Sequence, residues 1–94
     1  MVDYSALYED APDDVVFATY QELINNGDAW RLEGHVGRTA MRLIEDGLCI
    51  LGETDHRDYY GNHVPSRTQV EPGTKGSLEY AKARHPERWS DAKV

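Results

Sequence analysis

The sequence predicts a small α+β fold, in which a helical hairpin is followed by a small two-stranded antiparallel sheet and a short C-terminal helix. The first half of the chain repeats apolar residues at the three- and four-residue spacing of one helix face. After it, the run Leu-Cys-Ile-Leu at 48–51 is too short for a helix and apolar enough for a buried strand. A chain of 94 residues has room for one core, so we expect 1–94 to be a single domain.

The first helix is expected over residues 12–26. Pro12 suits the first helical position, and Asp13 and Asp14 complement the positive end of the helix dipole. The apolar stripe consists of Val16, Tyr20, Leu23 and Ile24. The sequence Asn-Asn-Gly ends this helix, and residues 1–10 before it form either one helical turn or an arm laid on the domain.

The second helix is expected to run from a cap at Asp28 to a stop at Gly47. Its apolar face consists of Leu32, Val36, Ala40, Leu43 and Ile44. Gly34 and Gly37 lie inside this helix, where each glycine costs about 1 kcal/mol relative to alanine. Two explanations remain open: the glycines let a neighbouring backbone approach closely, or the helix is broken there.

The second half of the chain predicts the sheet. Residues 63–70 can return as a strand that pairs with 48–51, and Pro65 restricts this strand to an edge of the sheet. Residues 53–62 form the polar loop between the two strands. Cys49 lies in the apolar run and is expected to be a small buried hydrophobic residue.

A short helix is expected over residues 78–84. Ser77 or Thr74 can cap its start, and Pro86 stops it. Residues 87–94 are expected to fray, except for Trp89, which can fold back onto the domain.

Charge is distributed unevenly along the chain. Residues 1–30 contain seven acids and neither Lys nor Arg, so they carry the whole net charge of −7, because 31–94 contain ten acids and ten bases. Such a segment repels nucleic acids and anionic membranes and suits a basic protein surface. Asp10, Asp13 and Asp14 are therefore candidate partner-binding residues, although a solvated acidic face would also explain them.

A second set of candidate partner-binding residues is the loop Arg57, Tyr59 and Tyr60, together with Arg67. Tyrosine and arginine dominate the energetics of protein interfaces. The alternative is that the tyrosines close the core and that Arg57 pairs with a nearby aspartate.

The sequence contains no pattern that indicates catalysis. The four histidines lack the close pairings of zinc sites, and no nucleophile elbow or phosphate-binding glycine loop is present. We expect no enzymatic activity, no metal and no cofactor. A single cysteine, and the lack of a long apolar run or signal peptide, predict a cytoplasmic protein that does not enter a membrane.

Residues 32–44, LEGHVGRTAMRLI, are similar to the helix-hairpin-helix DNA-binding element. That family carries Gly-x-Gly between an apolar residue and a Thr/Lys-Ala-x-x-Leu/Ile run, and its loop offers backbone N–H groups to a phosphate. Gly34 falls in register, and Gly37 lies one place later than the second glycine. The resemblance implies nucleic-acid contacts through Gly34, Gly37 and Arg38. A winged-helix-like element with its wing at 53–63 would give the same class of function.

At WRLEGHVGRTAM and HRDYYGNHVPSR the chain also resembles small proteins encoded by actinobacteriophages. The resemblance covers residues 28–90 and implies a small, early-expressed cytosolic phage product that binds a host protein or regulator. It carries over no functional residue.

Together these patterns predict a small acidic protein-binding module without enzymatic activity. The alternative is a nucleic-acid-binding regulatory protein. Because aliphatic residues are few and two glycines lie on a core helix, we also expect the helical hairpin to form a homodimer that buries Val16, Tyr20, Val36 and Ala40.

Overall fold

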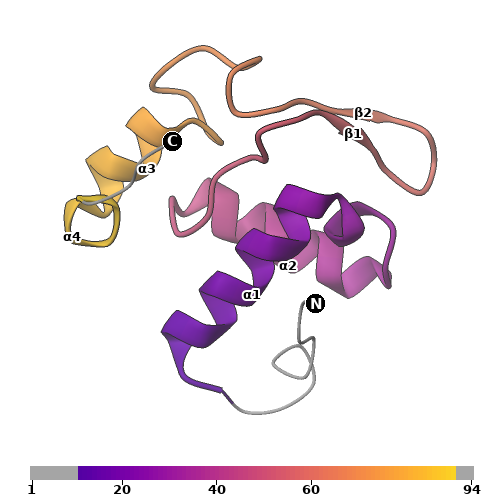
Figure 1. The fold of residues 1–94 in the computed structure, drawn as a ribbon, viewed down its shortest axis with the longest axis horizontal. Coiled ribbons are helices and arrows are strands. Elements are labelled where there is room, and N and C mark those ends of the chain that lie inside the picture. The colour runs from indigo at the N-terminus through magenta and orange to yellow at the C-terminus, as the bar shows by residue number, and fades with distance from the viewer. Residues whose placement is uncertain (1–10, 91–94) are drawn as a thin grey trace.

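The computed structural model describes residues 11–90, and the fold class is α+β as predicted (Figure 1). The predicted arm at 1–10, including Asp10, lies outside the described residues. The elements are helix α1 (Asp13–Asn26), the 3₁₀ helix η2 (Asp28–Trp30), helix α2 (Gly34–Glu45), strands β1 (His56–Arg57) and β2 (His63–Val64), and helices α3 (Leu78–Arg84) and α4 (Pro86–Trp89).

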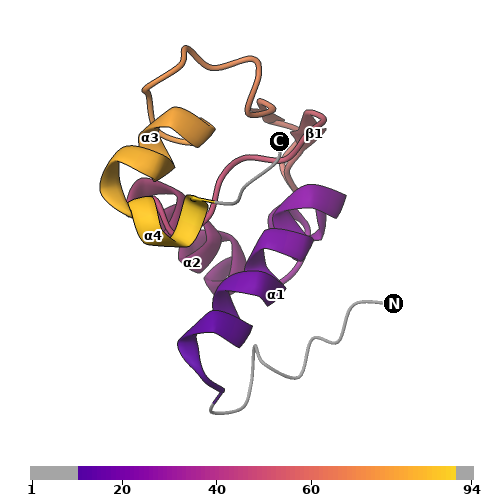
Figure 2. The ribbon, with the colours of Figure 1, turned by 60° about the vertical axis from the view of Figure 1, so that its left-hand side comes forward.

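Helix α1 matches the expected helix within one residue. Pro12 is its N-cap, and Gly27 ends it in the left-handed conformation with φ of 87°. The Gly27 N–H donates to the Ile24 carbonyl, and Tyr20, Leu23 and Ile24 bury the predicted stripe. In Figures 1 and 2, α1 packs beside α2, and the main core lies between these two helices and η2.

The predicted second helix is wrong at its start. Asp28 opens only a single 3₁₀ turn, and α2 begins at Gly34, after an extended residue at Glu33. The physical reason is the burial of Trp30: in a continuous helix Leu32 would share the face of Val36 and Trp30 would lie off it, whereas the separate turn buries Trp30 and leaves Leu32 exposed. The break therefore precedes the glycines. Gly37 serves close packing instead, since a Cβ at this position would lie 3.2 Å from the Ala29 carbonyl oxygen.

The predicted strand at 48–51 is also wrong. The sheet pairs β1 with β2 in an antiparallel register, with His56 opposite Val64 and Arg57 opposite His63. Residues 48–51 instead bend away from the end of α2 and form no strand; Cys49, Ile50 and Leu51 are buried, and Leu48 is half-buried.

Backbone and side-chain groups from elsewhere take the place of a partner strand along this segment: the N–H groups of Leu48 and Cys49 donate to the Leu43 carbonyl, and that of Leu51 donates to the Gly76 carbonyl. The Gln21 amide makes a pair of hydrogen bonds with the backbone of Ile50: Oε1 accepts the Ile50 N–H and Nε2 donates to the Ile50 carbonyl, both at 2.9 Å. Carbonyl oxygens at positions 47, 48 and 51 accept hydrogen bonds from Trp89 Nε1, Arg88 Nε and Arg67 Nε. The segment is therefore satisfied without a β-ladder.

The C-terminal part is more ordered than expected. Ser77 caps α3 by accepting the Tyr80 N–H, and Pro86 opens the further helix α4 at residues predicted to fray. Trp89 folds back as expected, buried against the chain with its indole N–H 2.8 Å from the Gly47 carbonyl oxygen. Residues 91–94 lie outside the described part of the chain.

The expected dimer surface does not exist as predicted. Tyr20, Val36 and Ala40 are buried in the core of a single chain, so they are not available to a second copy. Within residues 11–90, no helix is long and apolar enough to cross a membrane.

Candidate functional site

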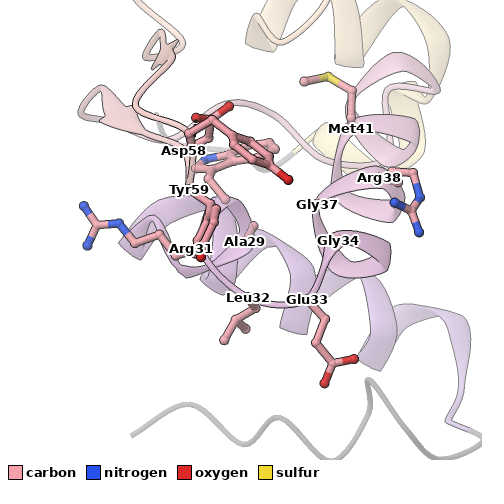
Figure 3. Close-up of a pocket in the computed structure, with 12 residues that line it drawn as sticks. Ala29, Arg31, Leu32, Glu33, Gly34, Gly37, Arg38, Met41, Asp58 and Tyr59 are labelled. Atoms are coloured by element: carbon pink, nitrogen blue, oxygen red, sulfur yellow. Dashed lines mark hydrogen bonds between the residues drawn. The ribbon is translucent and has the colours of Figure 1, made fainter.

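A groove of about 660 Å³ lies between the start of α2 and the turn that joins β1 to β2 (Figure 3). Residues 29–33 form one end of it. One wall is α2, at Gly34, Gly37, Arg38 and Met41, and the opposite wall is the turn, at Asp58, Tyr59 and Tyr60. We call this surface the tyrosine groove.

Exposed apolar side chains gather in the tyrosine groove. Tyr59 is 76% exposed and Tyr60 is 84% exposed, and their rings pack edge to face with centroids 5.3 Å apart. Leu32 and Met41 complete the set, so four of the five large exposed apolar side chains of residues 11–90 line one groove. A grouping of this kind is typical of a binding surface.

The turn that carries the tyrosines is fixed by hydrogen bonds. Asp58 Oδ1 accepts the backbone N–H groups of Tyr60 and Asn62 at 2.9 and 2.8 Å, and Oδ2 accepts the Asn62 side-chain amide. These bonds, with that of the Asn62 N–H the strongest, lower the pKa of the Asp58 carboxyl group. The Arg57 guanidinium closes the turn by donating to the Gly61 carbonyl oxygen.

A single long-range hydrogen bond docks this turn on the helical part of the protein. The Tyr59 N–H donates to the Trp30 carbonyl oxygen at 2.9 Å. Because Trp30 is buried in the core, the tyrosines are held at a fixed place beside η2. The backbone that carries the two rings is therefore held in place by the fold itself.

At Gly34 the wall formed by α2 is covered only by a flexible side chain. A Cβ there would meet only the Arg38 guanidinium, at 3.0 Å, which is the end of a flexible side chain. In Figure 3, Gly34 and Gly37 face the groove without side chains, whereas Arg31 and Arg38 extend outward on opposite sides of it.

Two sets of predicted residues meet in this groove. The first set, Tyr59 and Tyr60, was predicted to bind a protein. The second set was predicted to bind nucleic acid in the alternative function and consists of Gly34, Gly37 and Arg38. The fold places all five residues around one groove. The sequence pattern did not link them, because they lie about 20 positions apart and are joined only through η2.

The remaining predicted residues lie elsewhere. Arg57 holds the turn and does not line the groove. Arg67 serves the fold: its side chain donates to the Leu51 carbonyl and to Asn25 Oδ1, and partial burial lowers its pKa. Asp13 and Asp14 line a separate hollow of about 700 Å³, next to Arg84 and Arg88.

Sequence reasoning missed several residues of the groove, among them Leu32, Arg31 and Met41. Leu32 was assigned to the core face of the second helix, but the break before Gly34 turns it outward. Arg31 and Met41 were not singled out. Met41 carried a usable signal, since it is a large apolar residue that falls off the apolar stripe of α2.

Cys49 confirms its expected role as a buried hydrophobic residue. Its side chain is fully buried, and this burial raises the pKa of the thiol to about 12. The thiol is therefore protonated and shielded from reagents at neutral pH. Among residues 11–90, no three His, Cys, Asp or Glu side chains lie together as metal ligands would.

Comparison of the chain with models of protein families, with curated proteins and with solved structures finds no match.

Proposed function

We propose that this protein is a protein-binding module without enzymatic activity and that it holds its partner in the tyrosine groove. The observation that carries the proposal is the gathering of Leu32, Met41, Tyr59 and Tyr60 around one hollow. Apolar groups exposed together lose contact with water when a partner covers them, which is the main favourable term in protein association.

The fixed turn supports the same proposal. Tyrosine offers a large contact area with few rotatable bonds, so its immobilisation costs little conformational entropy. The hydrogen bonds of Asp58 and the bond from Tyr59 to Trp30 hold the backbone of the turn in advance. Such preorganisation reduces the entropic cost of binding.

The resemblance to actinobacteriophage proteins supports a biological setting for this module. A small phage product without catalytic machinery acts by binding, so the partner in this proposal is a cytoplasmic protein of an actinobacterial host, whose activity the module modulates.

Affinity capture tests the proposal. Tagged protein is incubated with actinobacterial lysate, captured proteins are identified by mass spectrometry, and each is then tested as a purified protein. The double variant Tyr59→Ala/Tyr60→Ala should lose the partner, with about 2 kcal/mol or more lost at each hot-spot residue. Val15→Ala is the matched control, because Val15 is an exposed apolar residue outside the groove.

A partner that binds all three proteins equally would place the binding surface outside the tyrosine groove. In that case the hollow beside Asp13 and Asp14 becomes the surface to examine, through charge reversal at these two residues.

Nucleic-acid binding is the second candidate, because Gly34, Gly37 and Arg38 line the same groove as the aromatic rings. Tyrosine rings can stack on bases, and arginine can contact phosphate. Against it stand the net charge of −7 and the single 3₁₀ turn of η2, where the helix-hairpin-helix element has its first helix. A mobility shift on duplex DNA at about 50 mM salt that Arg38→Ala abolishes would favour this candidate.

A further inference from the structure

The positive charges at the tyrosine groove have no partner within the described chain. Hydrogen bonds or ring contacts engage four arginines of residues 11–90, namely Arg57, Arg67, Arg84 and Arg88. Arg31 and Arg38 are both exposed, and the guanidinium group of neither forms an ion pair or hydrogen bond with another described residue. Both line the groove.

The negative charges at the same groove are already engaged. The Glu33 carboxylate lies 3.3 Å from His35 Nδ1. The Asp58 carboxylate accepts three hydrogen bonds from its own turn. The formal charges of the groove cancel, but the charge available to a ligand is that of the two arginines.

Because these two arginines stand on opposite sides of the apolar hollow, as Figure 3 shows, we propose that the tyrosine groove takes an acidic peptide segment of the partner, with apolar side chains in the hollow and carboxylates at Arg31 and Arg38. This inference rests on the proposed function and names the partner's chemistry. A guanidinium can bind a carboxylate through two parallel hydrogen bonds, which fixes its orientation as well as its position.

A peptide fits the groove better than a nucleic acid does. Leu32 and Met41 form part of its lining, and aliphatic side chains favour an apolar anchor over the face of a base. A nucleic acid would also bring a phosphate for every nucleotide towards a protein of net charge −7, whereas a peptide needs acids only at two places. The paired acids Asp13 and Asp14 lie at the other hollow and do not line this groove.

Peptide display tests the inference directly. A phage-displayed library of random dodecapeptides is panned in parallel on the parent protein, on Arg31→Glu/Arg38→Glu and on Tyr59→Ala/Tyr60→Ala. The parent should enrich peptides in which Asp or Glu flanks Leu, Phe, Tyr or Trp. The arginine variant should bind these peptides about tenfold more weakly and should enrich Lys- and Arg-containing peptides instead.

Matched variants separate the groove from general charge and folding effects. Arg42→Glu/Lys82→Glu makes the same change in net charge at two exposed, unpaired residues outside the groove, and it should select the same peptides as the parent. Met41→Gln changes the α2 wall and should weaken the binding of the selected peptides. It takes the place of the tyrosine variant if that variant does not fold. Thermal melting of each variant shows whether it is folded.

The outcomes distinguish the inference from the function on which it rests. If the parent enriches peptides without acidic residues and the tyrosine variant does not bind them, the acidic peptide is overturned and the proposed protein-binding groove stands. If the parent enriches no peptide, or if the tyrosine variant selects the same peptides, the acidic peptide and the protein-binding groove are both overturned. Binding of a fluorescent single-stranded oligonucleotide that is lost in Arg31→Glu/Arg38→Glu would make nucleic acid the occupant and overturn the acidic peptide.

Discussion

Alanine at the two glycines of α2 should change stability in opposite directions. At Gly34 the added methyl group meets only the Arg38 guanidinium, which can move aside, so the variant keeps the gain of replacing glycine in a helix. That gain is about 0.5–1 kcal/mol for an interior position and smaller here, at the first residue of the helix. Gly34→Ala should therefore melt at or a few degrees above the parent temperature.

At Gly37 the same methyl group would lie 3.2 Å from the Ala29 carbonyl oxygen. This backbone atom cannot move easily, because Ala29 and Trp30 are buried and the Trp30 carbonyl holds the N–H of Tyr59. Overpacking costs about 1–3 kcal/mol, and a neighbour that is a backbone atom places this site in the upper part of that range, at about 2–3 kcal/mol. Subtracting the helix gain of about 1 kcal/mol leaves an expected net loss of about 1–2 kcal/mol and a melting temperature lower by about 4–16 °C.

Urea and thermal unfolding, monitored by circular dichroism, measure both effects, and Gly34→Ala is the matched control for Gly37→Ala. A Gly37→Ala variant as stable as the parent would refute the close-packing explanation of this glycine. Tryptophan fluorescence gives a second readout, since displacement of η2 should change the surroundings of its buried Trp30.

Three further predictions concern the segments that support the groove and the core. Gln21→Ala removes both hydrogen bonds to the backbone of Ile50 and should cost about 2 kcal/mol or more in urea unfolding, whereas an unchanged midpoint would mean that water replaces the amide. The lowered pKa of Asp58 means that its contribution to the turn is present above the ordinary aspartate range and is lost as pH falls through the folded-state value. The protection of the Tyr60 amide against exchange, relative to an unstructured peptide at the same pH, should therefore fall in acid, and Asp58→Ala should remove this pH dependence. Cys49 should react with a thiol reagent only when the protein unfolds, so fast labelling of the native protein would show that the core opens locally.

The sequence predicts those elements whose signals are local. Helix α1 is bounded by Pro12 and Gly27, and α3 by the Ser77 cap and Pro86, so both are found nearly at their true ends. The start of α2, by contrast, is not set by a local sequence signal. Asp28 carries the signature of a helix cap, but the chain makes only one 3₁₀ turn there, and tertiary packing against α1 and α2 buries Ala29 and Trp30.

The segment at 48–51 shows the same limit more clearly. Its apolar composition is that of a buried strand, and it is buried. Its hydrogen-bond partners, however, include the side chains of Gln21, Arg67 and Arg88, which no short-range pattern associates with a backbone. Composition predicts the burial here, and only the tertiary structure identifies the partners.

The candidate site was predicted in parts. Tyr59 and Tyr60 are exposed, as expected for a binding loop, and Gly34 with Arg38 lies at a helix start where a ligand could approach. The link between the parts is the hydrogen bond from Tyr59 to Trp30, which joins residues 29 positions apart. Neither end of that bond carries a signal in the sequence.

The hydrogen bonds that α4 makes to residues 47 and 48 have a consequence for the order of folding. Arg88 and Trp89 reach carbonyl groups 40 and 42 positions earlier in the chain. During synthesis from the N-terminus, α1, α2 and the hairpin can all form before either side chain exists, and until then both carbonyls must be satisfied by water. Contacts of such long sequence separation slow folding, and we expect the nascent chain to remain loosely packed on this side until α4 has emerged.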